Sequence, residues 1–181
     1  PPVKLLSHRL PEIPEGYDWD VCTAEALITR MSASNGEIVL PDGMSYKMLV
    51  VEHASDMPLP VLRHIAQLLD QGVPVFAGRP EGSISLKEKA DSAEYQTIVN
   101  KLWGTKETTS GVRTVGKGKL YWGMSLAEAL QEQGIRPDMG IKSGNTPTDK
   151  VYFSHRCLAD ADVYFINNHS EREFKDGVVL R

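Results

Sequence analysis

A β-α-β pattern near the middle of the chain constrains the fold more than any other feature of the sequence. Apolar runs at residues 46–51 and 73–77 predict two buried strands, and residues 58–70 between them predict an amphipathic helix. The apolar residues of that helix recur on one face: Leu59, Leu62, Ile65, Ala66 and Leu69. A connection of this length favours a right-handed parallel crossover, and parallel strands need helices on both faces of their sheet.

Other segments supply that cover. The further predicted elements are helices at 21–31, 91–103 and 126–133, and strands at 37–40 and 120–122. Asp20 is expected to cap the first of these helices, and Asn35 with Gly36 to stop it. Together with the β-α-β unit, these elements predict a three-layer α/β domain.

The pattern changes after Arg136, where strands follow one another without a helix. Residues 151–156 and 161–166 alternate with a period of two and predict an antiparallel pair, and residues 175–181 begin a third strand. The predicted organisation has three parts: a Pro-rich lead-in at 1–16, an α/β domain at 17–140 and a β-rich segment at 141–181.

Composition excludes two classes of partner. The 181 residues carry a net charge of −4 and are 41% hydrophobic, so the chain can bury a core. Its Lys and Arg residues are scattered, without the basic stripe that nucleic acid requires, and no apolar run approaches the ~20 residues of a membrane span. We expect neither nucleic acid nor a membrane as partner. Because the sequence opens on Pro1 without a leader, we also expect a piece of a longer polypeptide.

The sequence gives little support for a catalytic nucleophile or for a phosphate-binding loop. The sequence has no Gly-x-Ser-x-Gly elbow, and the glycine-rich residues 116–119 precede a predicted strand instead of a helix. Cys157 and His155 point the same way along a strand, but strand neighbours make a poor catalytic dyad. Cys22 lies on a predicted helix and is interpreted as a small buried apolar residue.

Carboxylates near the end of the chain offer weak alternatives. Asp160 and Asp162 would share one face of a regular strand at roughly 6–7 Å, but a solvated turn explains them more simply. With His155 and Asn167 they form a mixed set of metal ligands that lacks a recognised spacing. No cofactor is predicted, and calcium or zinc at these residues, or calcium in a parent enzyme, stays an open alternative.

The strongest polar cluster lies on the two predicted antiparallel strands. Residues 154–156 and 164–168 bring together Ser, His, Arg, Asn and aromatic side chains. Such side chains bind sugars by hydrogen bonds to hydroxyl groups and by stacking on ring faces. Packing is the competing interpretation, in which Arg156 pairs with Asp160 or Asp162 and the rings fill a core or a contact between domains. The residues alone leave both open.

Several motifs, in order, carry a resemblance to a known family. They are GYDWDV at 16–21, LPDGMSY at 40–46, GKGK at 116–119, HR at 155–156 and ADVYFINN at 161–168. In combination they resemble large bacterial glycoside hydrolases of the α-L-rhamnosidase type, family 106. The resemblance spans most of the chain.

The resemblance implies a non-catalytic place in such an enzyme. The catalytic carboxylates are expected on a separate (β/α)-barrel, and this segment resembles an accessory domain downstream of it. The implied fold is a three-layer flavodoxin-like or glutamine-amidotransferase-like α/β sheet with helices on both faces, followed by antiparallel strands that start a β-sandwich. His155, Arg156 and Asn167 match the family pattern and are the candidate substrate-binding residues, with no catalytic or metal-binding residue assigned.

The partners expected from the resemblance are the barrel and β-sandwich domains of the same polypeptide, and an oligo- or polysaccharide. An expected first strand is missing before the Pro-rich lead-in, so an exposed sheet edge would favour a homodimer. The location expected for such an enzyme is periplasmic or extracellular. Two alternatives stay open: an independent carbohydrate-binding module, and a small stand-alone hydrolase with an unrecognised site.

Overall fold

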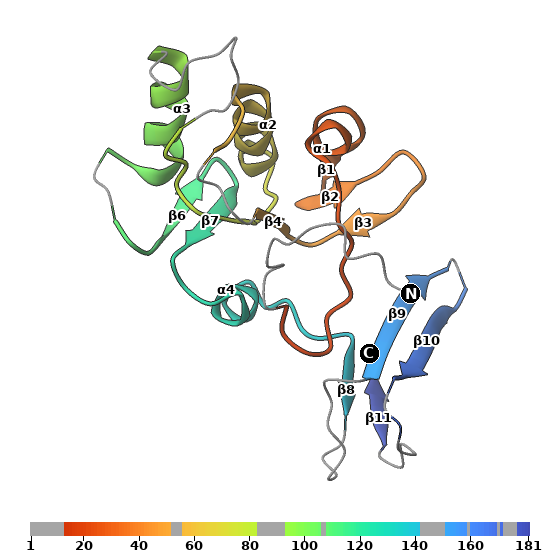
Figure 1. Ribbon diagram of the computed structural model, residues 1–181. Helices are drawn as coiled ribbons and strands as arrows, with labels where there is room; N and C mark the ends of the chain where they lie inside the picture. The colour runs from red at the N-terminus through yellow and green to blue at the C-terminus, as the bar shows by residue number, and fades with distance from the viewer. Residues whose placement is uncertain are drawn as a thin grey trace. The chain divides into compact units, whose positions relative to one another are not determined.

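The computed structural model of the chain divides into two compact units. The first takes in Cys22–Gln133, and the second joins Glu12–Val21 to Gly134–Arg181 (Figure 1). The described residues are 13–51, 56–82, 93–105, 108–141, 151–158, 160–169, 171 and 177–181. Most of the predicted lead-in therefore lies outside the described residues, and the domain bounds drawn from the sequence stay a prediction.

The sheet of the first unit has four strands in the order β4, β5, β7, β6. Their bounds are Leu49–Val51 (β4), Val75–Ala77 (β5), Gly118–Trp122 (β7) and Gly111–Val115 (β6). Strands β4, β5 and β7 are parallel, and β6 is antiparallel to β7. The predicted β-α-β unit is confirmed, because helix α2 (Leu59–Asp70) connects the parallel pair β4 and β5. The sequence did not predict β6.

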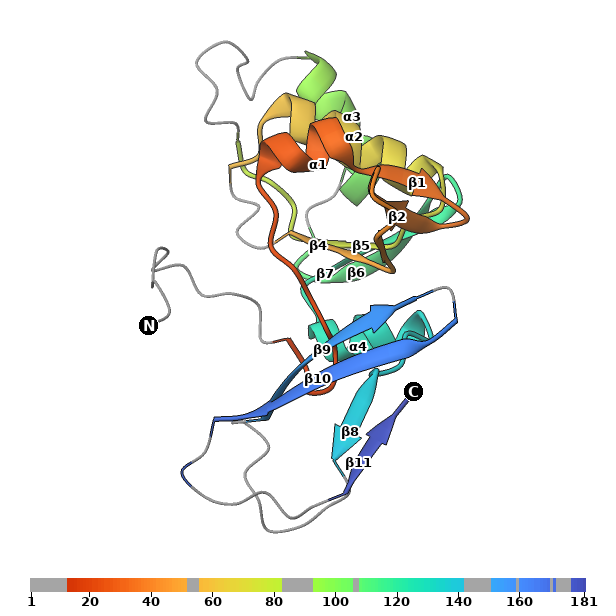
Figure 2. The same ribbon diagram turned by 90° about the vertical axis from the view of Figure 1, so that its right-hand side faces the viewer.

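Helix α2 forms where the sequence predicted it and carries much of the core. Pro60 stands in its first turn, where a missing N–H costs nothing, and the chain leaves the helix through Gln71. Its apolar face is buried, with Leu62 and Ile65 fully enclosed. Helices α1 (Ala24–Arg30) and α3 (Ala93–Trp103) lie on the same side of the sheet in Figure 2.

Helix α4 (Leu126–Glu132) covers the other face of this sheet (Figure 2). Ser125 and Glu128 form a capping box at its start, which satisfies backbone N–H groups that the helix leaves free. At its far end, Gln133 donates a hydrogen bond to the hydroxyl of Tyr121 at 2.7 Å. The first unit is thus a mixed α/β domain, as expected.

A small hairpin sheet precedes β4 and corrects two expectations. Its strands are β1 (Ser32–Ser34), β2 (Glu37–Val39) and β3 (Ser45–Tyr46), all antiparallel. Asn35 and Gly36 were expected to stop the helix, but α1 ends at Arg30 and strand β1 follows it. The two residues have φ values of 52° and 81° and form the tight turn between β1 and β2. The predicted strand at 46–51 is divided, because its first residue pairs with β2 and its last three join the parallel sheet.

The start of α1 also differs from the prediction. Thr23, and not Asp20, is the N-cap, since its side-chain oxygen accepts a hydrogen bond from the backbone N–H of Ala26 at 3.2 Å. Cys22 was predicted to be a buried helical residue. It lies before the helix and is exposed, because the helix begins three residues later than the apolar spacing indicated.

The second unit is built from two antiparallel pairs. The predicted pair is confirmed as β9 (Val151–Cys157) and β10 (Asp162–Asn168), and β11 (Val178–Leu180) pairs with β8 (Met139–Ile141). The third strand was expected, but its partner β8 was not. No helix in the described part of the chain is both long and apolar enough to cross a membrane.

His64 on α2 gives the first unit a testable pH dependence. Its Nε2 atom is buried and has no hydrogen-bond partner among the described residues. Burial lowers the pKa of His64 from its ordinary value of 6.5, although a hydrogen bond with the backbone of Met31 opposes the shift. The unfolded chain therefore binds a proton before the folded one, and stability falls as pH drops below about 6.5.

Replacing His64 should remove that part of the pH dependence. We expect the free energy of unfolding to fall between about pH 7.5 and about pH 5.5 by more in the parent chain than in His64→Leu, because only the parent must bury a group that protonates near pH 6.5 when unfolded. Urea titrations at both pH values measure the difference. Equal slopes in the parent and His64→Leu would refute the prediction.

Candidate functional site

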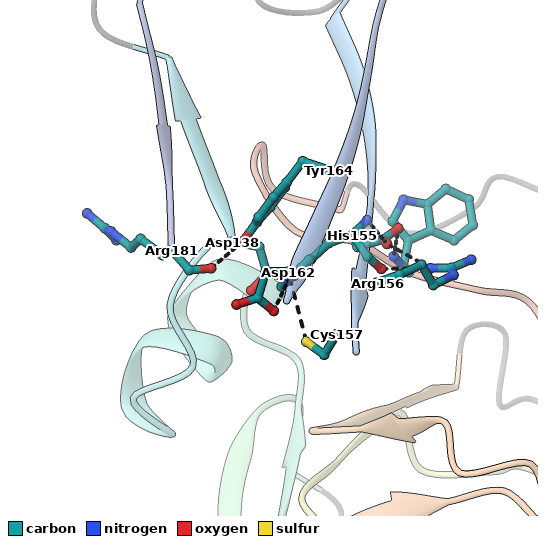
Figure 3. A network of polar contacts seen from close by, with 9 residues as sticks. Asp138, His155, Arg156, Cys157, Asp162, Tyr164 and Arg181 are labelled. Carbon is teal, nitrogen blue, oxygen red and sulfur yellow. Dashed lines mark hydrogen bonds and ion pairs between the residues drawn. The ribbon is translucent and has the colours of Figure 1, made fainter. Parts of the chain in front are cut away.

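Strand pairing brings a set of polar side chains onto one face of the β9–β10 hairpin. Residues alternate between the two faces of a strand, so His155 and Cys157 share a face. Their partners across the hairpin are Tyr164 and Asp162, respectively. All four side chains belong to the second unit and gather at one end of the hairpin, as Figure 3 shows.

His155 is the centre of this cluster. Its Nε2 atom lies 3.1 Å from Oδ1 of Asp162 and 3.6 Å from Sγ of Cys157. Its Nδ1 atom lies 3.8 Å from Oδ2 of Asp138, and its ring stacks on Tyr164 with centroids 4.1 Å apart. The imidazole therefore has a neighbour near each ring nitrogen and on one ring face. These neighbours leave only 11% of the side chain exposed.

Asp18 holds the backbone of the hairpin from a segment more than 130 positions earlier in the sequence. Its carboxylate accepts hydrogen bonds from the backbone N–H of His155 at 2.9 Å and of Trp19 at 3.0 Å. Arg156 donates to the same carboxylate at 3.5 Å and to the carbonyl of His155 at 2.8 Å. The Asp18 carboxylate therefore fixes strand β9 at His155, the central residue of the cluster.

Gly16 places Asp138 next to His155. Its carbonyl accepts from the backbone N–H groups of Asp138 at 2.8 Å and Met139 at 3.1 Å. Gly16 has a φ of +84°, and a Cβ atom there would lie 2.0 Å from the carbonyl oxygen of Met139. The carbonyl of Asp138 in turn accepts from Arg181 at 2.9 Å, whose own carbonyl accepts the hydroxyl of Tyr164.

The electrostatics of the cluster follow from these contacts. Hydrogen bonds from His155, and then from Cys157, lower the pKa of the Asp162 carboxyl, so it is ionised at neutral pH. Burial raises the pKa of Tyr164, which stays a neutral ring against the imidazole. His155, Cys157 and Asp162 offer nitrogen, sulfur and oxygen atoms that all lie within 4.8 Å of one another. These are donor atoms that can hold a metal ion.

The three predicted substrate-binding residues do not share one surface. His155 lies on the clustered face, whereas the alternation of the strands puts Arg156 and Asn167 on the other. Asn167 lies 2.9 Å from Nε2 of His169. Arg156 pairs with Asp18, in place of the Asp160 or Asp162 considered from the sequence.

Sequence reasoning missed most of the partners of His155. The alternation of β9 predicts that Cys157 points the same way as His155, but a spacing of two along one strand does not by itself indicate a functional pair. In the structure the two groups lie 3.6 Å apart. Asp18 belongs to the GYDWDV motif at 16–21, but nothing in the sequence connects it or Asp138 with His155, because their proximity depends on the chain path through Gly16.

The first unit has an open pocket of about 430 Å³ that includes Trp103, Arg113 and Trp122. Both tryptophans are buried and serve the fold: Trp103 donates to the carbonyl of Ala77 at 3.1 Å, and Trp122 donates to the carbonyl of Thr108 at 3.2 Å. Stacking on a sugar requires an exposed ring face. The pocket is therefore a weaker candidate than the hairpin cluster.

Comparison with known proteins places this chain among the glycoside hydrolases. The sequence profile of the α-L-rhamnosidases of glycoside hydrolase family 106 matches residues 1–178, and the chain belongs to that family. The solved structure of the rhamnosidase from Novosphingobium sp. PP1Y is similar, with a TM-score of 0.75 and 26% sequence identity over 86% of this chain and 15% of that one.

A second relative comes from Formosa agariphila and carries the name "Putative beta-glucuronidase". It is 29% identical over 170 residues, which cover 92% of this chain and 13% of that protein. Both relatives are therefore several times longer than this chain, which corresponds to one part of each. The predicted family is confirmed.

Gly16→Ala tests whether the chain path through Gly16 organises the cluster. A methyl group cannot fit 2.0 Å from the Met139 carbonyl oxygen, and the positive φ adds strain, so we expect a loss of at least about 2 kcal/mol in the free energy of unfolding. Denaturant titration measures it. Gly140→Ala, in β8 of the same unit with nothing within 4 Å of the added carbon, is the matched control. Equal losses in the two variants would contradict the assignment.

Asp18→Ala tests whether the Asp18 carboxylate stabilises the β9–β10 hairpin. The variant leaves two backbone N–H groups and one guanidinium without their carboxylate, which we expect to cost about 1–2 kcal/mol because Asp18 is partly exposed. Chemical-shift changes at His155 should accompany the loss. Asp160→Ala removes the same charge from the exposed β9–β10 turn and should stay within about 0.5 kcal/mol. A smaller effect at Asp18 than at Asp160 would overturn the prediction.

Proposed function

We propose that this chain is a non-catalytic accessory segment of an α-L-rhamnosidase-like glycoside hydrolase that acts on plant or microbial polysaccharide. The observation that carries the proposal is the length relation: nearly the whole chain matches the family, yet it corresponds to only 13–15% of the two relatives. Its partners would be a catalytic barrel and β-sandwich domains of the same polypeptide. For an enzyme of this kind, the location would be periplasmic or extracellular.

The carboxyl groups of the hairpin cluster support a structural role. A glycosidase needs a general acid whose pKa is raised, opposite a second carboxyl group that serves as base or nucleophile. The pKa of Asp162 is lowered instead, so this carboxyl is a poor acid. Asp18 accepts three hydrogen bonds from its own unit, which makes it an anchor of the backbone.

The flavodoxin-like or amidotransferase-like fold of the first unit is part of the same proposal. Parallel strands β4, β5 and β7, with α2 on one face and α4 on the other, support a flavodoxin-like or amidotransferase-like layer. The antiparallel β9–β10 pair supports the start of a β-sandwich. In this proposal, the α/β layer packs beside the catalytic barrel, and an exposed edge of its sheet would allow homodimers.

A second candidate is an independent carbohydrate-binding module. Tyr152 and Phe165 lie on the hairpin face opposite the cluster and are 57% and 67% exposed. Arg156 and Asn167 belong to the same face, so two aromatic rings stand beside hydrogen-bonding groups. Exposed rings with polar neighbours are the usual means of binding a sugar, and equally fit a contact with another domain.

Hydrolysis of an aryl α-L-rhamnoside tests the non-catalytic assignment. We expect the chain alone to be inactive and the whole enzyme to be active, because the acid and base carboxyls would lie elsewhere. In the whole enzyme, Asp162→Asn should keep kcat within about tenfold, whereas loss of a catalytic carboxyl would cost far more. Turnover by the chain alone, or a loss above about a thousandfold in Asp162→Asn, would refute the proposal.

Two measurements then distinguish a purely structural role of the chain from sugar binding. Arg156→Ala in the whole enzyme should lower kcat/KM by roughly five- to 150-fold if Arg156 contacts substrate, which corresponds to about 1–3 kcal/mol. An unchanged value would leave only a packing role. Titration of the chain with oligosaccharides distinguishes the binding module, since a supporting segment should show no affinity in the millimolar range.

A further inference from the structure

We propose that His155, Cys157 and Asp162 form a binding site for a zinc-class transition-metal ion. Their donors are an imidazole nitrogen, a thiol sulfur and a carboxylate oxygen, all within 4.8 Å of one another. Zinc takes these three ligand types in proteins. The inference stands on the hairpin alone and does not rest on the function proposed for the chain.

The separations between donors match a tetrahedral ion. With metal–nitrogen and metal–oxygen distances near 2.1 Å and a metal–sulfur distance near 2.3 Å, tetrahedral geometry puts nitrogen about 3.4 Å from oxygen and about 3.6 Å from sulfur. In the structure, Nε2 of His155 lies 3.1 Å from Oδ1 of Asp162 and 3.6 Å from Sγ of Cys157. These two separations thus agree with those of an occupied site to about 0.3 Å.

The strands impose this arrangement before any ion binds. Cys157 and Asp162 are directly paired across the hairpin, and His155 lies two residues before Cys157 on the same face. Leu158 donates to the carbonyl of Ala161 at 2.8 Å and closes the turn between the strands. All three ligands come from one hairpin of the second unit, so the site needs no contact between the two units.

The surroundings of His155 resemble the support that metal-bound histidines receive. Such residues present one ring nitrogen to the metal while the other faces a carboxylate or carbonyl. Here Nε2 faces the other two donors, and Nδ1 lies 3.8 Å from the carboxylate of Asp138. The Tyr164 ring stacks on the imidazole with only 9° between planes, and Asp18 holds the backbone N–H. The ring is thereby held with the metal-facing nitrogen toward Cys157 and Asp162.

The donor set selects the kind of ion. Calcium takes six to eight oxygen ligands, whereas this cluster has one carboxylate beside a nitrogen and a sulfur. Sulfur and imidazole favour zinc and its neighbours in the first transition row. Asp162 is 62% exposed and Cys157 is also exposed, so a fourth position faces solvent and can take water or a ligand from outside the hairpin.

Cobalt titration of the full chain, reduced and free of metal, tests the site. We expect one Co²⁺ per chain, with the intense visible absorption of tetrahedral Co²⁺ and a thiolate-to-cobalt charge-transfer band, and displacement of both by one Zn²⁺. Cys157→Ser should abolish the charge-transfer band, and Asp162→Asn, a conservative change at an exposed position, should weaken binding at least about tenfold. Circular dichroism checks that each variant is folded.

Two further variants make the result decisive. Cys22→Ser removes the other exposed thiol and should leave the spectrum unchanged. Asp138→Asn should weaken binding by about 10- to 100-fold without changing the charge-transfer band, as expected for a residue that positions His155. Absence of a tetrahedral spectrum at millimolar cobalt, a band retained in Cys157→Ser, or a band lost in Cys22→Ser would each overturn the proposal.

Discussion

Asp18 anchors the β9–β10 hairpin through hydrogen bonds to backbone groups, and the geometry of the polar cluster depends on that anchor. The same N-terminal segment contributes Gly16, whose carbonyl binds β8 and so brings Asp138 beside His155. Neither contact involves apolar burial. Strands β9 and β10 of the second unit are largely exposed. Directional hydrogen bonds to the backbone therefore hold them in place, whereas apolar burial holds the strands of the first unit.

The two faces of the hairpin have different chemistry, and this division organises the functional proposals. One face carries the imidazole, thiol and carboxylate, held by Tyr164 and Asp138. The other carries Tyr152 and Phe165 with large exposed areas. Exposed aromatic rings on a chain that matches only part of longer relatives fit a contact with another domain or a saccharide. The imidazole, thiol and carboxylate of the other face fit an ion, since their donor atoms lie within 4.8 Å of one another.

Membership of the rhamnosidase family is compatible with the non-catalytic role that we propose for the chain. Glycosidases take their acid and base from carboxyl groups in contrasting environments. In the hairpin, hydrogen bonds stabilise the ionised form of Asp162 and lower its pKa, which makes this carboxyl a poor general acid. A large enzyme can use such a segment to shape or bury the flank of its active site without lending it a reacting group.

The sequence by itself determined the elements that follow from periodicity: the β4-α2-β5 unit, helix α4 and the antiparallel β9–β10 pair. It also determined that His155 and Cys157 share a strand face. Only the tertiary structure decided that β8 pairs with β11, and that Asp18 and Asp138 meet His155. Local spacing decides which side of a strand a residue faces. Contacts between separate segments, such as that of Asp18 with His155 137 positions later, depend on the chain path between them, which no local pattern records.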